Sequence, residues 1–79
     1  MVLEEIELGK YLHYKTGKLY QVLGTARHSE TLEDMVVYQA LYYCEKFGRN
    51  QIWVRPKKMF LEYVVYDGHH VQRFKQIKE

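Results

Sequence analysis

The sequence predicts an all-β fold, a small antiparallel barrel of five to six short strands with one short 3₁₀ turn. Short runs of β-branched and aromatic residues are separated by turn signals, which is typical of strands. No long apolar stripe with helical spacing interrupts this pattern. Because 79 residues bury only one modest core, we expect a single domain over residues 1–79 with its core at about 9–77.

The first half of the chain contains three expected strands. Residues 9–15 form the first, which ends at the turn Thr16–Gly17–Lys18, where glycine tolerates a positive φ. A second strand covers residues 19–27, and Gly24 within it indicates a bulge. Residues 35–44 form the strongest strand. Both of its sides are apolar, so we expect it at the centre of the barrel.

The second half contains a fourth strand and a closing hairpin. Residues 51–55 form the fourth strand. Pro56 cannot donate to a ladder, so residues 56–60 should leave the sheet as a short 3₁₀ turn. Asp67–Gly68 is a strong type I′ turn signal between the two strands of residues 61–75. A long central strand followed by a late 3₁₀ turn favours an SH3-like barrel over an OB-like one.

Composition narrows the class of protein. Cys44 is the single cysteine, so neither an internal disulfide nor a cysteine zinc site can form, and we expect a cytoplasmic location. Residues 1–7 carry three acids and no apolar stretch, unlike a signal peptide. No run is long enough to span a membrane, so no membrane partner is expected. The formal charge of +2 is too small to indicate nucleic acid by itself.

The strongest functional candidate is a polar and aromatic cluster near one end of the barrel. A tryptophan flanked by tyrosines and arginines can stack on a planar ligand, and arginine binds carboxylate or phosphate with two hydrogen bonds. We expect Trp53 to be partly exposed and to touch Tyr42 or Tyr43 across a hairpin. This predicts a non-catalytic binding module for a peptide, a protein or an anionic small ligand. Its candidate residues are Arg27, His28, Glu30, Tyr38, Trp53 and Arg55.

Structural roles for the same residues stay open. Trp53 can instead fill the barrel while Arg55 pairs with Glu30 or Asp34. Two strand arginines that meet at one end of the barrel would form an anion pocket, whereas arginines paired with glutamates would be structural. The residues concerned are Arg27, Arg55 and Arg73, with Glu30, Glu33 and Glu62 as partners. Exposed strand edges also leave a homodimer as an alternative.

A second candidate function is the binding of single-stranded nucleic acid. The segment 46–58 contains five cations and no acid, with aromatic residues nearby. Its candidate residues are Lys46, Arg49, Lys57 and Lys58. We favour this function less, because such a run is usually a solvated face.

A third alternative is a small hydrolase-like enzyme that uses His28, Ser29 and Glu30. Successive residues on an extended chain diverge, and no nucleophile elbow surrounds Ser29, so we expect turn-capping roles and no enzyme. The four histidines lack the helical spacing of a zinc site. We therefore expect no metal and no cofactor. These histidines are His13, His28, His69 and His70.

The order and spacing of several motifs resemble a known family. The motifs are Tyr11-x-His13-Tyr14-Lys15, Ala26-Arg27-His28-Ser29-Glu30-Thr31, Val36-Val37-Tyr38-Gln39-Ala40-Leu41-Tyr42, Trp53-Val54-Arg55-Pro56-x-x-Met59-Phe60 and Arg73-Phe74. Together they resemble the small bacterial domain-of-unknown-function family numbered sixteen-fifty-three, over about residues 9–77. The resemblance implies an SH3-like β-barrel and brings no activity, ligand or catalytic residue.

Overall fold

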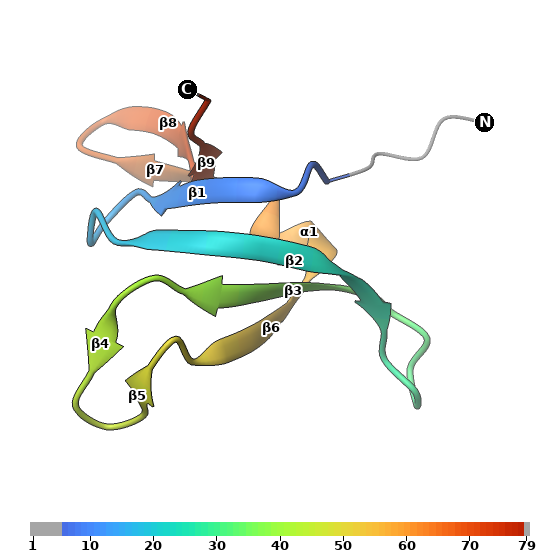
Figure 1. Cartoon of the computed structure of the whole chain (residues 1–79). Coiled ribbons are helices and arrows are strands. Elements are labelled where there is room, and N and C mark those ends of the chain that lie inside the picture. The colour runs from blue at the N-terminus through green and yellow to red at the C-terminus, as the bar shows by residue number, and fades with distance from the viewer. Residues whose placement is uncertain (1–5, 79) are drawn as a thin grey trace.

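Antiparallel strands make up most of the protein, as its computed structural model shows (Figure 1). The structure describes residues 6–78, so most of the acidic segment 1–7 lies outside the described residues. Along the chain the elements are β1 (Gly9–His13), β2 (Leu19–Arg27), β3 (Asp34–Ala40), β4 (Tyr43–Cys44), β5 (Gly48–Arg49), β6 (Ile52–Pro56), α1 (Lys57–Phe60), β7 (Tyr63–Tyr66), β8 (His69–Gln72) and β9 (Phe74–Gln76). The all-β prediction is confirmed.

Five strands form one open sheet in the order β6-β3-β2-β1-β9. Strands β6 and β9 are its edges, and β4–β5 and β7–β8 form separate two-stranded hairpins. The predicted closure into an SH3-like barrel therefore stays a prediction. The described residues hold more strands than the five to six expected, because two expected strands are each broken in two and β5 lies where a loop was expected.

The expected strand over residues 35–44 is wrong in its last part. Strand β3 ends at Ala40, and β4 pairs only with β5, opposite Arg49 and Gly48. The chain leaves the sheet because residues 41–50 form a hairpin of their own. As a result β6 returns closer to the start of β3 than expected. Trp53 lies opposite Tyr38, not opposite Tyr42 or Tyr43.

The observed bulge at Gly24 and the Asp67–Gly68 turn agree with those predicted from the sequence. The β2–β3 register shifts between Val22 and Gly24, which confirms the bulge. Asp67 and Gly68 have φ values of 53° and 79°, as the two central residues of a type I′ turn require. The expected bounds of the second strand, 19–27, are those of β2.

The segment after Pro56 is a single α-helical turn and not the expected 3₁₀ turn. The Leu61 backbone N–H donates to the Lys57 carbonyl at 3.0 Å, a bond that spans four residues as in an α-helix. Proline at the position before α1 needs no hydrogen-bond partner for its nitrogen. The turn is held in place by Phe60, which is buried against the sheet.

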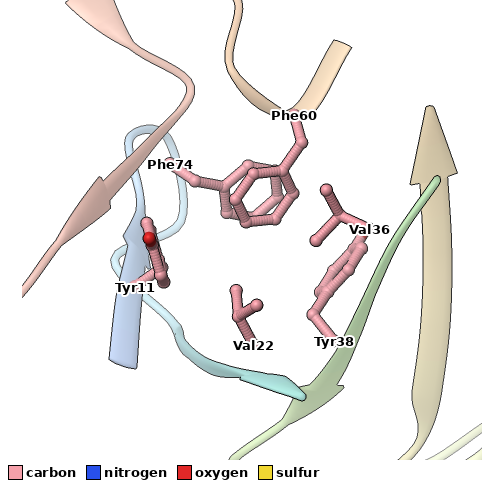
Figure 2. Packing of buried hydrophobic residues seen from close by; sticks show 6 residues of the cluster. All are labelled: Tyr11, Val22, Val36, Tyr38, Phe60 and Phe74. Carbon is pink, nitrogen blue, oxygen red and sulfur yellow. The ribbon is translucent and has the colours of Figure 1, made fainter. Parts of the chain in front are cut away.

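The core lies between the inner face of the sheet and α1, and aromatic rings fill it (Figure 2). Phe60 stacks on Phe74 with ring centroids 4.3 Å apart and an interplanar angle of 2°. Tyr11 and Tyr38 meet Phe60 edge-on. Such a core contains few aliphatic side chains, and the polar ends of its tyrosines reach toward the rim of the sheet. Its buried members are Tyr11, Val22, Val36, Tyr38, Phe60 and Phe74.

Candidate anion-binding site

The six predicted binding residues fall into two groups that the structure does not bring together. The first group lies at the β2–β3 turn, where Arg27 is opposite Asp34. The second group lies on the inner face of the sheet, where Tyr38 is opposite Trp53. Along β3, at about 3.3 Å per residue, the position of Tyr38 and Trp53 is about 13 Å from Asp34, and Arg55, opposite Val36, is about 7 Å along the strand from Asp34.

Residues of the first group are used within their own turn. The His28 Nδ1 accepts hydrogen bonds from the backbone N–H groups of Glu30 and Thr31, at 3.1 and 3.3 Å. Arg27 donates to the Leu32 carbonyl at 3.0 Å and pairs with Asp34 at 3.5 Å. The turn therefore accounts for the polar groups of Arg27 and His28, and Glu30 is exposed.

The proposed hydrolytic set does not show the geometry of a triad. His28 uses its Nδ1 as a turn cap. Within residues 6–78, no hydrogen bond joins the side chains of His28, Ser29 and Glu30. A triad requires the base to contact the nucleophile and the acid to orient the base. The Thr31 Oγ1 accepts the Glu33 backbone N–H at 3.2 Å, as expected of a turn cap, whereas the main cap is His28, which the sequence did not single out for this role.

Arg55 is the central residue of the second group. Its Nε donates to the Tyr38 hydroxyl at 3.3 Å, and its guanidinium carbon lies 5.6 Å from the Phe74 ring centroid. Arg55 is half-buried. The ion pairs of the described residues use Arg27, Arg73 and Lys78, so Arg55 has no carboxylate partner there. The pairing of Arg55 with Glu30 or Asp34, considered as an alternative, is not observed.

Arg73 precedes Phe74 in the chain, and its charge acts on His13 together with that of Arg55. Its Nη2 pairs with Glu62 at 2.8 Å, as the structural alternative expected. The Arg73 Nε is buried and has no hydrogen-bond acceptor in the described part of the chain. A buried N–H without an acceptor is unusual and unfavourable. The Arg73 side chain would have to move before a ligand could supply an acceptor to this donor.

His13 is a further residue close to Arg55 and Arg73. It lies opposite Phe74 in the β1–β9 ladder, with the ring centroids 5.1 Å apart. Burial lowers the pKa of His13, and the charges of Arg55, Arg73 and Lys15 lower it further. The ring is therefore neutral at pH 7. Its Nδ1 accepts the Lys15 backbone N–H at 3.2 Å, which leaves the proton on Nε2 as a donor.

Tyr20 and Tyr42 connect the residues around Arg55 with the β4–β5 hairpin. The hydroxyls of Tyr20 and Tyr42 are 2.6 Å apart. Burial raises the pKa of Tyr20, and the hydrogen bond with Tyr42 raises it further. The Tyr20 ring meets Tyr38 and Phe74 edge-on, at 5.4 and 5.6 Å. A chain of edge-on ring contacts, in part buried, therefore connects the Arg55 site to the hairpin.

Trp53 is half-buried and packs against the core. Its ring meets Phe47 edge-on at 5.2 Å. The expected partial exposure is observed, together with the core contact that the structural alternative expected. Trp53 is thus placed to respond to changes near Tyr38.

The four candidate residues for nucleic acid lie in two places. Lys46 and Arg49 belong to the β4–β5 hairpin, before β6, whereas Lys57 and Lys58 belong to α1, directly after it. Strand β6 separates the pairs by its own length, about 16 Å for five residues. The basic segment is therefore not one continuous surface.

Residues 6–78 contain no group of three or more His, Cys, Asp or Glu side chains that could hold a metal ion. In the same part of the chain, no helix is long and apolar enough to cross a membrane.

His13 and Tyr20 are site residues that the sequence analysis did not select. His13 lies two residues after the inward-facing Tyr11, and Tyr20 lies two residues before the inward-facing Val22, so the period of two could have placed both on the inner face. Their contact with Phe74 depends on the pairing of β9 with β1, which no local sequence pattern predicts.

The fold and site define a small antiparallel β protein in which an arginine on the inner face of an open sheet has no carboxylate partner within residues 6–78. The sequence of the chain matches the family of proteins of unknown function DUF1653 over residues 9–76, so the chain belongs to this family. The chain is similar to a crystal structure of a DUF1653 protein from Bordetella bronchiseptica, with a TM-score of 0.82 and 32% identity over 96% of this chain and 92% of that one. No curated protein matches it.

Proposed function

We propose that this protein is a non-catalytic binding protein that takes an anionic ligand around Arg55. The ligand group is a carboxylate or a phosphate, carried by a small molecule or a peptide. The observation that supports this function is the half-buried guanidinium of Arg55, which has no carboxylate partner within residues 6–78. A charge withdrawn from water without a counter-ion is unfavourable. A bound anion replaces the lost hydration with charge-assisted hydrogen bonds.

Neighbouring groups support the same ligand chemistry. Further donors are the His13 Nε2, beside the Phe74 ring, and the Arg73 Nε, once the Arg73 side chain moves. Because His13 is neutral, the site has two positive charges, of which Glu62 offsets that of Arg73. The net positive charge belongs to Arg55. We therefore expect one anionic group to bind with its oxygens toward Arg55.

This function narrows the predicted set of residues. Tyr38, Trp53 and Arg55 remain in the site, and His13 and Arg73 join it. Arg27, His28 and Glu30 are left to the β2–β3 turn, where Arg27 and His28 already have partners.

The test measures thermal unfolding with added inorganic phosphate, citrate or an acidic peptide, against sodium chloride at equal ionic strength. A ligand that binds the folded state at about a hundred times its Kd stabilises it by about 2.7 kcal/mol, which raises the Tm. Arg55→Gln should abolish this rise, and Arg55→Lys should reduce it because lysine lacks the planar fork. Arg27→Gln removes an equal charge outside the site and should keep the rise.

Two results would contradict the proposal. One is an anion-induced rise in Tm that Arg55→Gln leaves unchanged. The other is the absence of any rise with all three anions beyond that given by sodium chloride. Trp53 fluorescence gives a second readout, since Trp53 lies opposite Tyr38, the hydrogen-bond partner of Arg55.

A further inference from the structure

The β4–β5 hairpin carries aromatic rings that the fold does not bury. It lies outside the five-stranded sheet, and only two residue pairs connect its strands (Figure 1). Tyr43 is 56% exposed and Phe47 is 47% exposed. A hairpin this short has little stability of its own. Exposed rings on such an element contribute little to the core, so a packing role does not explain both of them.

Cations lie over the rings at this end of the molecule. The Lys46 Nζ is 5.4 Å from the Phe47 ring centroid, and the Arg49 guanidinium carbon is 5.8 Å from that of Tyr43. A third cation, the Lys18 Nζ, lies 4.4 Å from the ring centroid of Tyr42. Of the four cation–π contacts in the described residues, these three lie at the hairpin.

In the part of the chain that the structure describes, these cations have no carboxylate partners. The ion pairs within residues 6–78 involve none of Lys18, Lys46 and Arg49. A cation–π contact at an exposed site is weak, so each cation can move from its ring to a phosphate at little cost. Glu45 is the single acid between residues 41 and 50. With Lys18 included, the hairpin surface has a net charge of +2 from three cations and one acid.

We infer that this hairpin surface binds single-stranded nucleic acid, separately from the anionic ligand proposed at Arg55. Bases stack on exposed aromatic rings, and neighbouring cations contact the phosphates, which is how sequence-independent single-strand sites are built. A strand pair of two residues is too short to enter a duplex groove as a reading element, so unpaired bases are the expected ligand. Lys57 and Lys58, beyond β6, are not included.

The experiment measures fluorescence anisotropy of a labelled oligothymidine of about a dozen nucleotides, a length within the usual site size. If three cations contact phosphates, a plot of the logarithm of the association constant against the logarithm of the salt concentration should have a slope of about −2. This corresponds to a loss of about fifteenfold between about 50 and 200 mM salt. The duplex of the same length should bind more weakly than the single strand.

Two double variants test separately the contributions of the aromatic rings and of the cations to binding. Tyr43→Ala/Phe47→Ala keeps the cations and should weaken binding at least about tenfold, because each stacked base contributes to affinity. Lys46→Gln/Arg49→Gln keeps the rings and should reduce the salt slope to about −0.7. The matched control, Lys58→Gln/Lys75→Gln, removes two exposed cations away from the hairpin and should stay within about twofold of the natural sequence.

The inference fails if the oligonucleotide does not bind at low salt, or if the control pair loses as much affinity as the hairpin pair. It also fails if the ring variant binds like the natural sequence, since charge alone would then explain the binding. Arg55→Gln distinguishes the two proposals. That variant should lose the anion-induced rise in Tm and keep oligonucleotide binding, so either proposal can fail without the other.

Discussion

Replacement of Phe60 by alanine should remove much of the stability of the fold. Phe60 is 1% exposed and is among the largest fully buried side chains. It stacks on Phe74 and meets Tyr11 and Tyr38 edge-on. Truncation of a buried phenylalanine costs about 3–5 kcal/mol, since the surrounding rings relax only in part. A domain of 79 residues has a total stability of about 4–12 kcal/mol.

We therefore expect Phe60→Ala to lower the free energy of unfolding by about 4 kcal/mol. For a domain of this size the Tm should fall by roughly 16–32 °C. Urea denaturation followed by Trp53 fluorescence gives the first value by linear extrapolation, and calorimetry gives the second. The control is Met59→Ala on the same helical turn, where the side chain is 45% exposed and the loss should stay below about 1 kcal/mol. Equal losses in the two variants would refute the reasoning that Phe60 anchors α1 to the sheet.

Two titrations test the electrostatics of the site. The pKa of His13 lies below 6.5, mainly because of burial and then because of Arg55 and Arg73. Its contribution to stability should therefore be complete above pH 6.5 and be lost as the pH falls through the folded-state value. In an NMR titration Arg55→Gln should raise the pKa of His13, and an unchanged value would place Arg55 too far away to matter. The pKa of Tyr20 lies above 10.0, so its contribution is complete below pH 10.0 and is lost as the pH rises beyond it. Burial also raises the pKa of Tyr11, so ultraviolet titration should show more than one late-ionising tyrosine. Tyr20→Phe should remove one of them, and an unchanged number of late-ionising tyrosines in that variant would contradict the assignment.

Local signals in the sequence were sufficient for several elements. Strand β2 was predicted with its observed bounds, because the Thr16–Gly17–Lys18 turn precedes it and the polar segment 28–34 follows it. Gly24 and the Asp67–Gly68 turn were predicted because each depends on backbone properties of one or two residues. The break after Ala40 was missed, since the apolar run continues through Cys44 and only the separate pairing of β4 with β5 ends it.

The sequence was sufficient to select some residues of the candidate site. It was not sufficient to predict which residues the fold brings together there. Arg55 and Trp53 were selected from their neighbours in the sequence, and both lie on the inner face. The partner of Arg55 could not be predicted, because the Tyr38 hydroxyl reaches it only through the observed β3–β6 register. His13 enters the site through the pairing of β1 with β9, which joins opposite ends of the chain.

That pairing of β1 with β9 has a consequence for the order of folding. Strands β1, β2, β3 and β6 pair in sequence order, so each can join by closing a short loop. Strand β9 must close the longest loop of the sheet, and it brings Phe74 with it, together with the adjacent Arg73. We expect β9 to dock last and to detach first in partial opening. A bound anion that contacts both Arg55 and Arg73 would then hold β9 against the sheet. It would slow hydrogen exchange in β1 and β9 more than elsewhere.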